Sequence, residues 1–162
     1  MTYSAIRLLE DRLPASTSVL EWGAGASTLF FQDRVQQVVS VEHNGEWFEQ
    51  LGSQVGAAVT LKFAPTKDEY IRPKFEEQEV SQFDLIVVDG IHRIECLEQA
   101  ENLVSPRGVI LLDDSTRSEY DPARTRLSGL GYKELCLYGL RPASSYFEGT
   151  SFFYRDNNIF GL

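Results

Sequence analysis

Two acids and two glycines near the start of the chain have the spacing of a nucleotide-binding pocket. Glu21 precedes Gly23 and Gly25 in the run E-W-G-A-G-A-S-T, and Glu42 lies 21 residues after Glu21. Glycines at a tight turn let the backbone pass close to a ligand where a Cβ would clash. An acid at the end of the following strand can accept hydrogen bonds from ribose hydroxyls. The pattern therefore predicts a site for an adenosine-containing molecule.

The turn differs from the dinucleotide fingerprint G-x-G-x-x-G at its third position. Thr28 stands where that fingerprint has the glycine that allows close helix–strand packing. Glu21 at the strand end would repel a pyrophosphate, whereas it suits a ligand with an ammonium or sulfonium group. The alternative is a turn whose glycines serve only steric needs. The shared register of strand, turn and acid favours the ligand site.

Further carboxylates follow two later apolar runs. Asp89 ends the first run, and the adjacent pair Asp113 and Asp114 ends the second. Ligands bind at the carboxyl ends of the strands in an open α/β sheet, and clustered carboxylates repel one another. Either a divalent cation such as Mg²⁺ or the side chains of Arg93 and Arg117 must therefore neutralise them. Adjacent strand residues point to opposite faces, so the pair can share one ion only if the strand breaks there.

His92 follows Asp89 by three residues, in the loop that precedes a predicted helix. A lone histidine has a structural role in most proteins. Beside carboxylates at the end of a central strand, however, an imidazole is suited to accept a proton from a substrate. Both interpretations stay open from the residues alone.

Strand and helix signals alternate along the chain, which indicates an α/β fold with a mostly parallel sheet. The expected strands are 18–22, 37–41, 58–63, 83–88, 109–112, 132–138 and 151–154. The expected helices are 4–13, 27–33, 46–55, 93–104 and 122–130. The polar stretch 64–82 has two interpretations, a solvated surface and a flap beside the pocket. Trp47 and Phe48 lie on the apolar side of the third helix and are expected in the core, although the side chains just after Glu42 also lie where an adenine could stack.

The size and charge of the chain limit the classes of function. A length of 162 residues suits a single domain, 1–162, with one substantial core. The net charge of −9 argues against a nucleic-acid partner, since such binding needs Lys and Arg to neutralise phosphates. No apolar run approaches the roughly 18 residues of a membrane span, and no signal-peptide pattern opens the chain. We therefore expect a cytoplasmic protein without a membrane partner, and we expect Cys96 and Cys136 to be unpaired, buried residues.

The motif E-x-G-x-G-x-S-T with the later Glu42 resembles the first motif of class I S-adenosylmethionine (SAM)-dependent methyltransferases. The segment Asp89-Gly90-Ile91-His92, followed by Asp113 and Asp114, resembles the metal-dependent O-methyltransferases of natural-product pathways. Within that group the likeness is greatest to the macrocin-type sugar enzymes and their cephalosporin-cluster relatives. It covers about residues 18–115.

The resemblance implies a Rossmann-like fold, a cofactor, a metal and a base. The sheet would have seven strands in the order 3-2-1-4-5-7-6, with the last strand antiparallel and helices on both faces. The residues implied in SAM binding are Glu21, Gly23, Ala24, Gly25, Ser27, Thr28, Glu42, His43 and Asp89. Asp89, Asp113 and Asp114 would bind Mg²⁺, and His92 would act with Asp89 in catalysis, as the base. The implied reaction is transfer of a methyl group to a hydroxyl of a small-molecule acceptor.

The chain departs from the resemblance at its N-terminus. Only about fifteen residues precede the first strand, whereas the metal-dependent enzymes have a longer region that helps to enclose the acceptor. The acceptor site would then come from the acidic stretch, from residues 139–149 or from a partner subunit, so a homo-oligomer is one possibility. The candidate acceptor contacts are Tyr70, Arg141, Tyr146 and Phe147.

Two other functions stay open. One is a metal-free methyltransferase for another acceptor atom, in which basic side chains pair with the acids. The other is a non-catalytic SAM-binding module that needs a partner chain. Thr28 and Glu21 together disfavour a nicotinamide oxidoreductase.

Overall fold

The computed structural model describes residues 1–75, 82–142 and 144–162, and its centre is a seven-stranded sheet. The strands are β1 Ser18–Trp22, β2 Gln37–Glu42, β3 Val59–Phe63, β4 Phe83–Val88, β5 Val104–Asp113, β6 Lys133–Leu140 and β7 Phe147–Tyr154. Their order is β3-β2-β1-β4-β5-β7-β6. Strands β1 to β5 pair in parallel, and β7 is antiparallel to both of its neighbours. The expected topology is confirmed.

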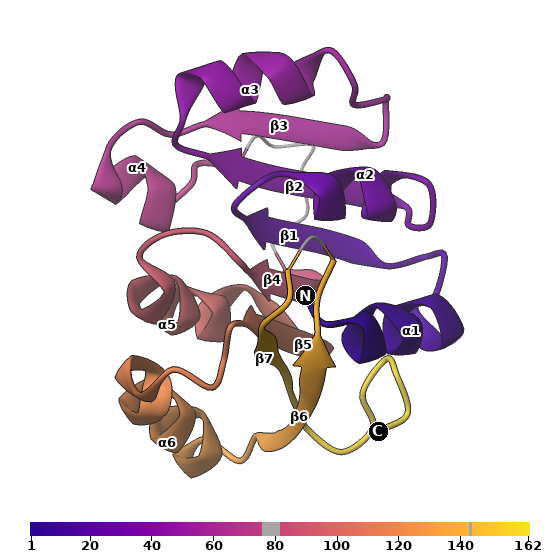
Figure 1. The fold of residues 1–162 in the computed structure, drawn as a ribbon, viewed down its shortest axis with the longest axis vertical. Helices are drawn as coiled ribbons and strands as arrows, with labels where there is room; N and C mark the ends of the chain where they lie inside the picture. The colour runs from indigo at the N-terminus through magenta and orange to yellow at the C-terminus, as the bar shows by residue number, and fades with distance from the viewer. Residues whose placement is uncertain (76–81, 143) are drawn as a thin grey trace.

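Helices cover both faces of the sheet (Figure 1). They are α1 Tyr3–Arg12, α2 Ala26–Gln32, α3 Gly45–Gly52, α4 Lys67–Ile71, α5 Arg93–Leu103 and α6 Asp121–Gly129, with a short 3₁₀ helix η1 at Ser118–Tyr120. Apolar residues of α1 and α2 form one core with one side of the strands. Those of α4, α5 and α6 form a second core with the other side. Because side chains alternate along a strand, the strands contribute residues to both cores.

The two central strands bring the glycine turn and Asp89 together. In β1 and β4, Trp22 lies opposite Val88, so the two parallel strands end at the same level. The backbone pairing continues past their ends: the Asp89 N–H donates to the Trp22 carbonyl (2.9 Å), and the Gly23 N–H donates to the Val41 carbonyl (3.0 Å). The arrowheads of β1, β2 and β3 point the same way in Figure 1. This shared edge is where an open α/β sheet binds its ligand.

Several of the expected elements change in extent or character. The stretch 64–82 contains the short helix α4, capped by the side chains of Thr66 and Glu69, and residues 76–81 lie outside the described part of the chain. A helix of one turn has no hydrophobic period to detect. Strand β5 begins at Val104 and β7 at Phe147, because pairing with neighbouring strands extends both beyond their apolar runs.

Two expectations about burial were wrong. Cys136 is exposed, although Cys96 is buried as expected, and both cysteines are free. Strand β6 lies at the edge of the sheet, so alternate residues face solvent. Trp47 is 39% exposed rather than in the core. Within the described ranges, no helix is long and apolar enough to cross a membrane.

Candidate functional site

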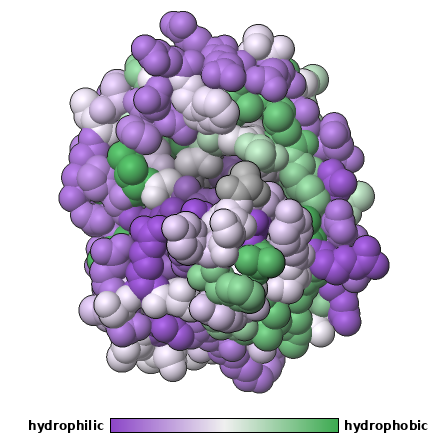
Figure 2. All heavy atoms as spheres, in the orientation of Figure 1, coloured by the Kyte–Doolittle hydropathy of each residue, from purple (hydrophilic) through white to green (hydrophobic). Residues whose placement is uncertain are grey.

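A cavity of about 990 Å³ lies at the carboxyl ends of the central strands. It is lined by Met1, Ile6, Gly23, Ala24, Gly25, Ala26, Ser27, Phe30, Glu42, His43, Asn44, Trp47, Asp89, Gly90, Asp113, Arg141 and Pro142. Figure 2 shows this face of the molecule hollowed near its middle. The volume lies at the upper end of the range for ligand pockets, about 300–1,000 Å³. The cavity can therefore hold two small molecules side by side.

The glycine turn requires glycine at its first position. Gly23 has φ +96°, and a Cβ there would lie 2.7 Å from the Asp89 carbonyl oxygen and from Gly90. Gly25 has a φ near 180° and only Trp47 close to the position of a Cβ, at 3.9 Å. Gly23 therefore allows the ends of β1 and β4 to approach closely, whereas the absence of a side chain at Gly25 leaves space on the cavity side.

Glu21 lies behind the turn and does not line the cavity. Its side chain is fully buried and accepts hydrogen bonds from the hydroxyls of Ser27, Thr28 (2.5 Å) and Ser40 (2.7 Å). Burial raises the pKa of Glu21, and these three hydroxyls act against that rise. The Gly25 N–H donates to Thr28 Oγ1 (2.9 Å), so Thr28 connects the turn to Glu21. Here the threonine at the third motif position holds the turn in shape, and the predicted contact of Glu21 with a cofactor stays a prediction.

Glu42 presents one carboxylate oxygen to the cavity. Its Oε1 accepts the backbone N–H groups of His43 (2.8 Å) and Asn44 (2.7 Å), and His43 Nδ1 lies 3.0 Å away. Its Oε2 makes no hydrogen bond to any residue of the described ranges. The side chain is held in place with one oxygen left to accept bonds from a diol. Glu42 and His43 therefore both lie where the sequence predicts a ribose.

Trp47 forms a wall of the cavity, although its spacing favoured a place in the core. Its Nε1 donates to the Ala24 carbonyl oxygen (2.7 Å), and its ring lies against Gly25. The interaction ties α3 to the glycine turn. Because Trp47 begins an amphipathic pattern, its spacing alone indicates a core residue; its closeness to Glu42 in sequence is the one signal for a ligand contact.

Asp89 stands in the middle of the cavity, at the end of β4. Arg93 Nη2 donates to its Oδ1 (3.1 Å), and Oδ2 has no hydrogen-bond partner in the described part of the chain. Burial, with the nearby charge of Asp113, raises the pKa of Asp89 to about 7. A carboxylate with such a pKa is suited to accept a proton near neutral pH.

The other two acids of the predicted metal site turn away from each other. Asp113 accepts hydrogen bonds from the Met1 ammonium (2.7 Å) and from Thr150 Oγ1 (2.6 Å). Strand β5 ends there, as the sequence predicted for a shared ion, and Asp114 has φ +52°. The Asp114 carboxylate, however, faces three arginines, Arg93, Arg117 and Arg141.

The three acids therefore do not fit a metal ion as a group, because cations pair with Asp113, with both oxygens of Asp114 and with one oxygen of Asp89. Among residues 1–75, 82–142 and 144–162, no three histidine, cysteine, aspartate or glutamate side chains are grouped closely enough to hold one. Arg93 alone reaches Asp89, Asp114 and the backbone carbonyl of Asp113. The arrangement supports the alternative in which arginines neutralise the cluster, and it does not support Mg²⁺.

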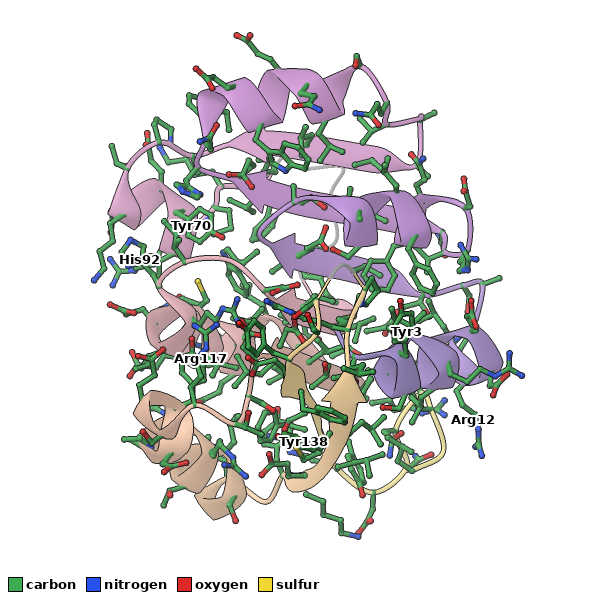
Figure 3. All side chains as sticks on the ribbon, in the orientation of Figure 1. Tyr3, Arg12, Tyr70, His92, Arg117 and Tyr138 are labelled. Atoms are coloured by element: carbon green, nitrogen blue, oxygen red, sulfur yellow. The ribbon has the colours of Figure 1, made fainter. Side chains whose placement is uncertain are left out.

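His92 lies outside the cavity. It precedes α5 with φ +52°, and its ring faces Tyr70, with 6.4 Å between the ring centroids. Figure 3 shows the two side chains together on the α4 side of the molecule. His92 is not among the residues that line the cavity, so the structure does not bring the predicted base to the site.

Of the four candidate acceptor contacts, Arg141 alone lines the cavity. Tyr70 is fully buried behind Gly90, whereas Tyr146 and Phe147 are exposed on the β6–β7 hairpin. The Phe147 ring stacks on Tyr138, at a centroid distance of 5.9 Å. The apolar residues Met1, Ile6 and Phe30 also line the cavity, and no sequence signal pointed to them.

No protein-family model matches the chain, and no curated protein matches it in sequence. Solved structures do match. The O-methyltransferase TomG from Streptomyces achromogenes, in complex with SAM, is 16% identical with a TM-score of 0.69, over 93% of this chain and 78% of that chain. Precorrin-6y C5,15-methyltransferase from Geobacter metallireducens is 17% identical with a TM-score of 0.67, over 93% and 87%.

The N-methyltransferase NodS from Bradyrhizobium japonicum, in complex with S-adenosylhomocysteine (SAH), is also similar. It is 17% identical with a TM-score of 0.65, over 94% of this chain and 84% of that chain. At these identities the likeness establishes the fold. The chain has the Rossmann-like fold of class I methyltransferases.

Proposed function

We propose that the protein is a SAM-dependent methyltransferase that methylates a hydroxyl group of a small molecule. One observation carries the proposal: a single cavity is lined by the glycine turn, by the acids Glu42 and Asp89, and by apolar residues together with Arg141. Such an arrangement provides for a nucleoside and for an acceptor. The SAM and SAH complexes of TomG and NodS support the choice of cofactor.

The residues at the glycine end fit SAM. Glu42 has a free carboxylate oxygen for the ribose hydroxyls. Trp47 and His43 offer ring surfaces for a base, and the space beside Gly25 accommodates the close approach of a ligand. Glu21, Ser27 and Thr28 then contribute mainly by holding the turn.

When bound, the cofactor supplies an activated methyl group, which forms a bond to the acceptor oxygen while the electron pair of its broken bond returns to sulfur. Asp89 Oδ2 accepts the proton of the acceptor hydroxyl and later releases it to water. Arg93 holds Asp89 through Oδ1 and so fixes the direction of Oδ2. The apolar wall around Phe30 orients the acceptor and limits the access of water.

The proposed reaction needs neither a metal at the acidic cluster nor His92. Treatment with EDTA, or the substitution His92→Ala, is expected to change the rate of methyl transfer by less than about threefold, because neither removes a group that lines the cavity. Initial rates of SAH formation measure both effects. If activity is lost in EDTA and restored by Mg²⁺, the result would contradict the metal-free reaction and support the metal-dependent mechanism.

Substitution of Glu42 tests the cofactor site. Glu42→Gln keeps one oxygen for the His43 and Asn44 N–H groups but replaces the free oxygen by a donor. We expect SAH to bind about 10- to 100-fold more weakly, as is typical for loss of a charged hydrogen bond. Isothermal titration calorimetry measures the change. The control Glu46→Gln removes the same charge from an exposed position on α3 and should leave the affinity unchanged.

A further inference from the structure

We propose that the acceptor carries a carboxylate or phosphate group and that Arg141 binds it. The inference rests on the proposed function and assigns the substrate class of the same cavity. Arg141 follows β6 and lines the cavity, with 37% of its side chain exposed. It is the one arginine among the described residues that line the cavity, and a polar group placed in this way fixes the orientation of a ligand.

Most of the guanidinium of Arg141 is free to bind a ligand. Its Nη1 donates to Asp114 Oδ1 at 3.2 Å, and this is its one hydrogen bond to the described residues. A guanidinium has five N–H donors in a planar fork that matches the two oxygens of a carboxylate or a phosphate. Arg141 therefore keeps enough donors for a bidentate contact.

Asp114 does not depend on Arg141 for neutralisation. Arg117 Nη2 donates to Asp114 Oδ2 at 2.5 Å, and Arg93 Nη1 lies 3.5 Å from the same oxygen. Figure 3 shows Arg117 below the loop after β4, near α5. Arg117 does not line the cavity, whereas Arg141 does. Among the described residues, Arg117 therefore pairs only with Asp114, and Arg141 can contact both Asp114 and the ligand.

The remaining charges orient the acceptor. Asp113 is occupied by the Met1 ammonium and Thr150, and Asp89 is the one carboxylate at this end with a free oxygen in the described ranges. Asp89 repels an anion, whereas Arg141 attracts one. An acidic acceptor therefore binds with its anionic group at Arg141 and its hydroxyl at Asp89.

Small aromatic probes test the inference in protein saturated with SAH. Benzoate, phenyl phosphate and the neutral benzamide are titrated by ligand-observed NMR. We expect at least one anion to bind about 10-fold or more tightly than benzamide, and Arg141→Met to weaken it about 10- to 100-fold. The more tightly bound anion identifies a carboxylate or a phosphate as the natural group. The control Arg126→Met removes an exposed cation that pairs with Glu101 outside the cavity and should leave anion binding unchanged.

The inference is overturned if benzamide binds as tightly as both anions. It is also overturned if Arg141→Met leaves their affinity unchanged or if Arg126→Met weakens it equally. The SAH titration that precedes these measurements reports separately on the proposed function, because the contacts proposed for SAM are the glycine turn, Glu42, His43 and Trp47 rather than Arg141. Arg141→Met should therefore retain wild-type SAH affinity.

Discussion

The substitution Asp89→Asn is expected to lower kcat by about 10²- to 10⁴-fold, the usual contribution of a positioned general base. Asparagine can still accept a hydrogen bond from Arg93, so the geometry at the end of β4 persists. It cannot accept a proton. Initial rates with an acceptor that the wild type methylates measure the effect, and SAH titration shows whether the cavity is intact.

The pH dependence of the reaction gives a second measurement on Asp89. Burial and the charge of Asp113 raise its pKa to about 7, and the active form is the carboxylate. kcat/KM should therefore rise as the pH increases through about 7 and level off above it. In Asp89→Asn this limb should disappear.

The exposed aspartate Asp68 on α4 provides the control, since Asp68→Asn changes the same charge far from the cavity. Its rate and its pH profile should match the wild type. If Asp89→Asn retains the limb and most of the activity, another group accepts the proton and the proposed base is wrong.

The substitution Gly23→Ala is expected to reduce the free energy of unfolding by about 2 to 5 kcal/mol. A left-handed φ costs an L-residue about 1–2 kcal/mol. Forcing a Cβ against the backbone of Asp89 and Gly90 adds about 1–3 kcal/mol or more, since neither neighbour is a flexible side chain that can move aside. Urea unfolding followed by circular dichroism measures the change.

The matched variant is Gly25→Ala, two residues along the same turn. Its Cβ meets only Trp47, at an ordinary contact distance, so stability should change by less than about 1 kcal/mol. SAH affinity should nevertheless fall, because the new methyl group lies beside the cavity. Equal destabilisation by the two alanines would contradict the distinct roles assigned to these glycines.

The sequence predicts the glycine end of the site well because its parts are local. The turn, Glu42 and Asp89 each follow directly on a buried apolar strand, and parallel strands must end at the same edge. Thr28 was also informative, because it distinguished the turn from the dinucleotide fingerprint. The direction of the Glu21 side chain could not be predicted from the sequence, because a carboxylate at a strand end can face either the ligand or the turn.

The acceptor end depends on contacts between distant segments. The direction of Asp113 is set by Met1 and Thr150, and Arg141 reaches Asp114 from the β6–β7 hairpin. None of these pairings leaves a periodic or spacing signal. The structure does not support the predicted metal site: the acids are at the expected strand ends, but Arg93, Arg117, Arg141 and the Met1 ammonium pair with them. Of these cations, Arg93 and Arg117 are the ones that the sequence offered as the alternative to a metal.

A crystal structure of the SAH complex tests the central claim most directly. We predict ribose hydroxyls on Glu42 Oε2 and the sulfur directed toward Asp89. Space should remain for an acceptor oxygen about 3 Å from both the transferred methyl and Asp89 Oδ2. SAH bound outside this cavity, or with its sulfur directed away from Asp89, would contradict the account.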